Sequence, residues 1–239
     1  MKIIREIPKG GKKLAAAKAI SKRPSYALEY GSATKTKWKP LYYVAAFCIP
    51  ALLVFISYVI FGVYPFGERS VLTLDLNGQY VYYFENIRKS FWEGESLLYS
   101  WSRNLSGGYQ GVIGYYLASP FTFIVILLPR KLIIEALMLM QLCKIGACGL
   151  TFAVFAQKSK GVKPLHSVMF GTMYALSAFM VIQLIDPMWL DGPIFLPLII
   201  LGVEYLVDDG RKQNYIITTA LMFIANLNIG FKDAIFVAL

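Results

Sequence analysis

The sequence predicts an all-α protein, a polytopic transmembrane helical bundle with about five spans. Of its 239 residues, 57% are hydrophobic and only 16% are charged, whereas a soluble domain usually has about 25% charged residues. The apolar residues occur in long runs, the clearest being 41–63, which contains no charge. A helix of that length crosses a hydrocarbon core of about 30 Å. The excess of apolar residues therefore indicates membrane spans rather than a large soluble core.

The first predicted part of the chain is a basic cytoplasmic tail, residues 1–40. It carries eleven Lys and Arg side chains against two Glu, which accounts for nearly all of the formal charge of +10. A basic block beside the first span is retained on the cytoplasmic side and suits anionic lipid headgroups. We therefore expect a multi-pass protein of the cell membrane with a cytoplasmic N-terminus. Membrane lipid is an expected partner, and nucleic acid is not.

The next part, 64–131, is predicted as the first external loop. Apolar side chains at helical spacing predict an amphipathic helix at the membrane surface within it. The glycine-rich run SGGYQGVIGYY that follows predicts a flexible loop. The apolar face of the predicted helix consists of Leu76, Tyr80, Tyr83, Phe84, Ile87 and Phe91.

Segment 117–129 decides the topology of the rest. If it were a span, the lysines at 158–163 and the basic pair at 211–212 would lie outside, against the positive-inside rule. Its short length and two prolines favour a re-entrant or interfacial segment instead. The transmembrane domain 41–239 then has its later spans at 132–156, 165–185, 194–207 and 215–231.

This topology places Asp75, Asp186 and Asp191 on the outer face. External acids are what a glycosyl-transfer site would need, because one carboxylate deprotonates the acceptor hydroxyl and a second can share a divalent cation with it. The sequence does not identify ligands for such a metal. A structural alternative stays open for each acid. Asp75 is well placed as a helix N-cap, and Asp186 and Asp191 as turn residues that open a helix.

Lys144 lies near the middle of the second predicted span. A cation in the membrane interior is costly and marks a functional residue by default. Two roles are open from the sequence. The ammonium contacts a phosphate, or it pairs with an acid, either elsewhere in the bundle or in a part of the protein outside this chain.

Four runs of the sequence carry a resemblance to a known family. LTLDLNGQYVYYF, LSGGYQGVIGYYLASPF, LCKIGACGLTF and MWLDGPIFLPLIILGVEYL, in this order over about 70–230, resemble the start of YfhO-like bacterial membrane proteins. That family is similar to the C-type (GT-C) glycosyltransferases, which are multispanning and take sugars from polyprenyl-phosphate carriers. The resemblance implies a GT-C-like fold.

The resemblance also implies an activity and its residues. It implies transfer of a sugar from a polyprenyl-phosphate donor to a cell-envelope polymer, such as teichoic or lipoteichoic acid, at the outer face. Asp75 corresponds to the catalytic acid of the first external loop, and Asp191, with Asp186 as the alternative, to a second acid. Lys144 would contact the donor phosphate, and Gln79 and Tyr80 would shape the site. A divalent cation is the one cofactor left open.

Members of that family are longer, so the sequence is expected to be an N-terminal portion that is inactive alone. Two other functions stay open. A transporter or flippase subunit would show an inverted repeat with broken helices, and the sequence shows no such repeat. A non-catalytic assembly protein would have neither an inverted repeat nor catalytic residues. The sequence does not give the sugar, the acceptor or the oligomeric state.

Overall fold

The computed structural model describes residues 39–101 and 107–238, so nearly all of the predicted tail lies outside the described part. The described chain is mainly helical, and its one short antiparallel strand pair is formed by β1 (Tyr99–Ser100) and β2 (Gly107–Gly108). Three described helices are long and apolar enough to cross a membrane, or four if one bent pair counts as a span. The predicted all-α membrane bundle is therefore confirmed.

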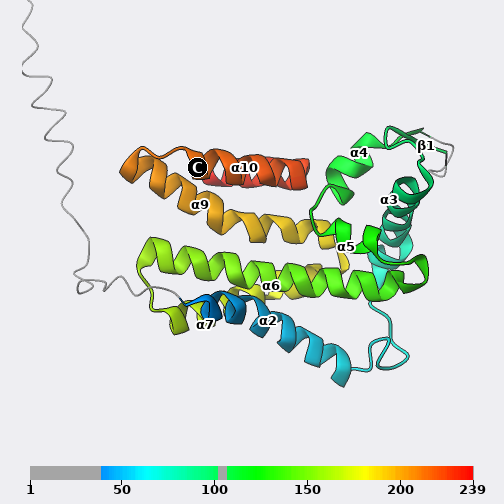
Figure 1. Cartoon of the computed structure of the whole chain (residues 1–239), viewed down its shortest axis with the longest axis horizontal. Helices are drawn as coiled ribbons and strands as arrows, with labels where there is room; N and C mark the ends of the chain where they lie inside the picture. The colour runs from blue at the N-terminus through cyan, green and yellow to red at the C-terminus, as the bar shows by residue number, and fades with distance from the viewer. Residues whose placement is uncertain (1–38, 102–106, 239) are drawn as a thin grey trace, which may run out of the picture. The chain divides into compact units, whose positions relative to one another are not determined.

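Helix α6 (Ile133–Lys160) is the central element of the bundle. It packs against α2 (Pro40–Ile60) and α7 (Pro164–Ala175), and also against α9 (Asp191–Asp209) (Figure 1). The predicted spans 41–63, 132–156 and 194–207 fall on α2, α6 and α9. That these helices cross the membrane in the predicted order stays a prediction.

Glycines allow the close approach of α2, α6 and α7. A Cβ atom on Gly149 would lie 2.6 Å from the carbonyl oxygen of Ala46 and 2.8 Å from Cγ of Pro50. A Cβ on Gly146 would lie 2.8 Å from the carbonyl oxygen of Phe47. Lipid tails are as apolar as leucine, so membrane helices associate through such tight backbone packing rather than through the hydrophobic effect.

Two predicted spans are interrupted in the structure. Residues 165–185 form α7, α8 (Ala178–Ile182) and η4 (Gln183–Ile185), with a bend of 49°. Residues 215–231 do not form one helix, because α10 (Gln213–Ala225) ends before an extended residue, Asn226, and α11 (Leu227–Ala238) follows. With 13 residues, α10 is about 20 Å long, short of a full crossing.

The chain between α2 and α6 gathers at one end of the long helices (Figure 1). Within segment 117–129 the longest helix, α5, has six residues, about 9 Å, and is too short to cross the membrane. Its re-entrant placement stays a prediction. The glycine-rich run expected to be a flexible loop is helical over 110–117. The helical elements of this part are η1 (Leu76–Tyr80), α3 (Val81–Glu93), α4 (Gln110–Val112), η2 (Ile113–Leu117), α5 (Thr122–Leu127) and η3 (Arg130–Leu132).

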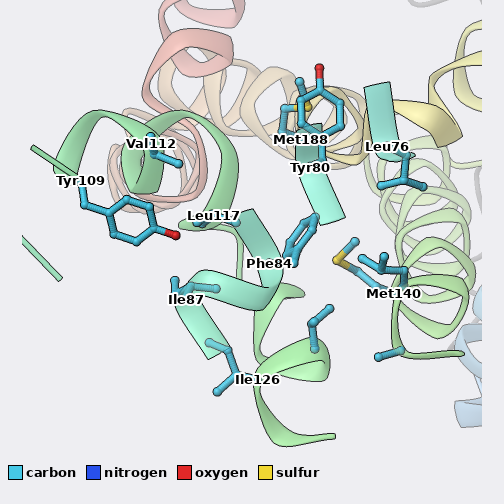
Figure 2. Packing of buried hydrophobic residues seen from close by; sticks show 13 residues of the cluster. Leu76, Tyr80, Phe84, Ile87, Tyr109, Val112, Leu117, Ile126, Met140 and Met188 are labelled. Carbon is cyan, nitrogen blue, oxygen red and sulfur yellow. The ribbon is translucent and has the colours of Figure 1, made fainter. Parts of the chain in front are cut away.

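The predicted amphipathic face exists and forms a hydrophobic cluster. Figure 2 shows its side chains meeting residues of α4, η2, α5, α6 and the segment that leads into α9. Phe91 is the exception and is 55% exposed. The last turn of α3 contacts α5 through Trp92 instead, whose Nε1 donates to the carbonyl of Ile126 at 2.7 Å. The buried members from the predicted face are Leu76, Tyr80, Phe84 and Ile87.

Candidate functional site

Asp75 directly precedes the π-helical turn η1, and its side chain is exposed. It makes no capping hydrogen bond, and its φ of −65° and ψ of −31° are helical, whereas an N-cap residue is typically extended. The N-cap explanation of this acid is therefore wrong for this structure. The N-cap was the one structural role that the sequence suggested for Asp75.

Asp186 is the second acid that the structure brings to Asp75. It lies between η4 and η5 (Pro187–Leu190). The Tyr80 phenol and the Asp186 carboxylate lie close enough to shift the pKa of one another, and the Asp75 carboxylate is close enough to act electrostatically on both. One oxygen of Asp186, Oδ1, is buried without a hydrogen-bond partner among the described residues. Two acids and a phenol thus meet where η1 faces the turn before η5.

The surroundings change the titration of these groups in a consistent direction. Burial raises the pKa of Asp186 above the usual aspartate range, and the Asp75 charge adds to the rise, while the Tyr80 phenol opposes it. Burial and the Asp186 carboxylate also raise the pKa of Tyr80. The phenol therefore stays protonated at neutral pH and acts as a hydrogen-bond donor.

Gln79 and two further tyrosines border the acids. Gln79 Nε2 donates to the hydroxyl of Tyr83 at 2.9 Å. The Tyr116 ring lies 5.4 Å from the Tyr80 ring and 5.1 Å from the Tyr83 ring, measured between centroids. We call these residues the acid–tyrosine site, which consists of Asp75, Gln79, Tyr80, Tyr116 and Asp186.

Lys144 does not belong to that site. Its ammonium is 2.7 Å from Asp191 Oδ1, 2.9 Å from the carbonyl oxygen of Pro187 and 3.1 Å from Ser119 Oγ. These three acceptors use all three N–H groups, and the side chain is 1% exposed. Lys144 therefore pairs with an acid, as the second of its two predicted roles requires, and the acid is Asp191 of the described chain. The ammonium has no N–H left for a donor phosphate.

Asp191 is the first residue of α9, as expected of a residue that opens a helix, but its side chain is fully buried. Its Oδ1 accepts from Lys144 and, at 2.9 Å, from Ser119 Oγ, while Oδ2 is buried without a partner among the described residues. The structure therefore separates the predicted site residues. Asp75, Gln79 and Tyr80 lie together with Asp186, and Asp191 lies with Lys144 in the interior.

Asn226 was not anticipated as part of the site. Its buried amide donates to the carbonyls of Tyr115, at 2.9 Å, and Met188, at 3.1 Å. Tyr115 precedes a residue of the acid–tyrosine site, and Met188 lies two residues after Asp186. A polar side chain inside an apolar run is the signal that could have found it.

A pocket of about 190 Å³ borders the acid–tyrosine site along the chain. Thr73, two residues before Asp75, and Ile185, one before Asp186, both line it. The lining is largely apolar, with a few polar groups. The full set is Tyr58, Val63, Ser70, Val71, Thr73, Gln141, Leu184 and Ile185.

The residues present do not form a complete metal site. Asp75 and Asp186 supply two carboxylates, and within 39–101 and 107–238 no three His, Cys, Asp or Glu side chains are grouped to hold an ion. The described residues thus supply two carboxylates and no third ligand for a divalent cation.

Comparison with known proteins gives one match. The family described as "Bacterial membrane protein YfhO" matches residues 45–239, well over half of the chain. The matched range includes the acid–tyrosine site, the Lys144–Asp191 pair and Asn226. No curated protein and no solved structure matches the chain.

Proposed function

The chain belongs to the YfhO family of bacterial membrane proteins, and we propose that it transfers a sugar from a polyprenyl-phosphate donor to a cell-envelope polymer. Teichoic acid is the class of acceptor that we favour. The observation that carries the proposal is the meeting of Asp75 and Asp186 beside the Tyr80 phenol. Carboxylates and a phenol side by side are groups that can serve acid–base catalysis of glycosyl transfer to a hydroxyl.

In the proposed reaction Asp75 is the general base. Its exposed carboxylate accepts the proton of the acceptor hydroxyl, and the hydroxyl oxygen forms a bond to the anomeric carbon of the sugar. The bond from that carbon to the phosphate oxygen breaks, and the polyprenyl phosphate leaves with the bonding electrons. The Asp186 carboxylate acts on the Tyr80 phenol beside it and keeps it protonated, and Gln79 with the tyrosine rings forms a wall for the sugar.

The distribution of charge supports an outer location of this site. Lys160, at the end of α6, pairs with Glu204 of α9 at 2.9 Å, and the basic pair at 211–212 directly follows α9. These basic groups lie at the end of α6 and α9 opposite to their acid-bearing starts (Figure 1). Since basic side chains are retained on the cytoplasmic side, the acids would face outward.

The bordering pocket supports a lipid-linked donor. Its lining includes the apolar side chains of Val63, Val71 and Leu184, which suit an isoprenoid segment, beside polar groups such as those of Thr73 and Gln141. A donor placed there would bring its phosphate-linked sugar next to the acids, because the pocket residues adjoin them in the chain.

A second candidate function is translocation of a lipid-linked substrate. The break between α7 and α8, with its 49° bend, is the kind of interrupted helix that transporters place at a substrate site. The buried Lys144–Asp191 pair lies in the same bundle. An ion pair at membrane depth is also a common part of transport pathways.

Radiolabelled donor distinguishes the two functions. Because this portion is expected to be inactive alone, membranes that contain a full-length parent of this sequence are given a polyprenyl-phosphate sugar labelled in the sugar, and the label in envelope polymer is measured. In parallel, purified protein in vesicles is tested for movement of a fluorescent polyprenyl-phosphate sugar between leaflets. Label in the polymer that is lost in Asp75→Asn supports transfer. Translocation without transfer would replace our proposal by the second candidate.

A further inference from the structure

The turn that carries Asp186 is held at two successive carbonyl groups. The carbonyl of Pro187 accepts a hydrogen bond from Lys144 Nζ at 2.9 Å, and that of Met188 accepts one from Asn226 Nδ2 at 3.1 Å. The two donors are far apart in the sequence, because Lys144 lies in α6 and Asn226 lies between α10 and α11. Both donor side chains are buried.

Asn226 also ties this turn to the first loop. Its second amide N–H donates to the carbonyl of Tyr115 at 2.9 Å, while its Oδ1 accepts from the backbone N–H of Ile229 at 3.0 Å. Tyr115 directly precedes Tyr116, which packs on Tyr80. One fully buried amide therefore joins the two segments that meet at the acid–tyrosine site.

The backbone at Asn226 is arranged for this contact. Its φ of −158° and ψ of 107° interrupt an otherwise apolar helical run between α10 and α11. A helix break among apolar helices exposes backbone groups that need other partners. The break costs less here, because the Asn226 backbone N–H donates to the carbonyl of Met222 and the side chain caps α11.

We infer that Asn226 is a positioning residue, which together with Lys144 clamps the 186–190 turn and holds Asp186 against Tyr80. This inference rests on the proposed function of the acid–tyrosine site. The amide touches neither the acids nor a substrate, so it acts only through the turn. A displacement of about 1 Å at a reacting group can cost on the order of 100-fold in rate.

The clamp has a consequence for pH dependence. Burial is the main cause of the raised pKa of Asp186, so a loosened and better hydrated turn would bring that pKa down. Asp75 and Tyr80 act directly on the titration of Asp186. The other charged groups at the turn are Lys144 with its partner Asp191, and Lys232, which lies over the Trp189 ring.

The test uses Asn226→Leu, which removes both donors, and Asn226→Ser, which keeps a small polar group too short to reach both carbonyls. Asn228→Leu is the matched control, because it makes the same change at an exposed position two residues away. Backbone hydrogen exchange of the 186–190 segment is measured in purified protein. We expect exchange at least about tenfold faster in both Asn226 variants and unchanged in Asn228→Leu. Equal exchange in Asn226→Ser and Asn228→Leu would overturn the clamp.

Sugar transfer by the full-length parent with the same substitutions tests the link to catalysis, because the N-terminal portion alone is expected to be inactive. Per folded protein, Asn226→Ser should transfer more slowly than Asn228→Leu by at least about tenfold, and its rate should fall at a lower pH on the acid side. Faster exchange with an unchanged rate and pH profile would make Asn226 purely structural and overturn the positioning role. Absence of transfer by the unmodified protein would instead refute the proposed function, while the exchange result would still decide the clamp.

Discussion

Lys144 of α6 and Asp191 of α9 form an ion pair of 2.7 Å in which neither side chain is more than 1% exposed. The pair crosses the contact between α6 and α9, and Ser119 from the first loop joins it through a hydrogen bond with each partner. Burying two charges is expensive unless they are paired and hydrogen-bonded. The pair therefore makes the positions of α6, α9 and the 117–121 segment depend on one another.

Loss of one partner of this pair should destabilise the protein strongly. Lys144→Met removes the charge at similar volume and leaves the buried Asp191 carboxylate without its cation, with Oδ1 bonded only to Ser119 and Oδ2 without a partner among the described residues. Breaking a buried pair in this way typically costs about 3–5 kcal/mol. We expect a large drop in the yield of folded protein, measured by fluorescence size-exclusion chromatography. The double variant Lys144→Met with Asp191→Asn should recover part of it, and a double variant no better than the single would contradict a direct pairing.

The glycine contact between α2 and α6 gives a second prediction. A methyl group at Gly149 would meet the Ala46 carbonyl and the Pro50 ring, so Gly149→Ala must push the helices apart. Overpacking of this kind costs about 1–3 kcal/mol, and the apparent melting temperature in detergent should fall. Gly114→Ala is the control, because a Cβ there meets nothing within 4 Å. Equal melting temperatures in the two variants would show that α2 and α6 are not packed as described.

The orientation can be tested with cysteines in a background that lacks the native ones. Ser96→Cys lies in the first loop, and Lys163→Cys lies just after α6; both positions are exposed. An impermeant thiol reagent should label the first in intact cells and the second only after permeabilisation. The reverse labelling would place the acids in the cytoplasm and would be incompatible with an outer transfer site.

The sequence was sufficient for features that depend on composition and periodicity. The apolar run at 41–63 predicts α2, and the spacing of Leu76, Tyr80, Phe84 and Ile87 predicts the buried face of η1 and α3. Lys144 stands out because a lysine is rare in a span. Because a buried ammonium needs a partner, the sequence predicts either a phosphate contact or a pairing acid. The structure contains the pairing acid, Asp191.

Features that depend on distant contacts could not be predicted in this way. Asp186 and Asp191 are five residues apart, and only the packing of α6 against α9 decides that Asp191 turns inward and Asp186 toward Asp75. The break at Asn226 is equally hidden, because its amide is satisfied by carbonyls more than 35 residues away in the chain. Local periodicity contains no information on such partners.

The Tyr80–Asp186 contact predicts a change in pH dependence. The phenol stabilises the Asp186 carboxylate and so opposes the rise of its pKa, while the Tyr80 ring fills the hydrophobic cluster (Figure 2). Tyr80→Phe keeps the ring and removes the hydroxyl, and the pKa of Asp186 should rise further. Asp186 is then protonated at a higher pH, and the acid side of the transfer profile should move upward. An unchanged acid limb would mean that Asp186 does not titrate in the reaction.

The central claim is that the Asp75 carboxylate acts in the chemistry and has no structural role. Sugar transfer by Asp75→Asn in the full-length parent tests this claim most directly, because the N-terminal portion alone is expected to be inactive. Asparagine has the shape of aspartate but cannot accept the proton, and losing a general base typically costs at least about 100-fold. Because Asp75 is exposed and caps no helix, we expect normal yield and melting temperature together with that loss of transfer. Asp208→Asn, an exposed acid at the far end of α9, should transfer at the parental rate. A folded Asp75→Asn protein that also transfers sugar at the parental rate would contradict the account.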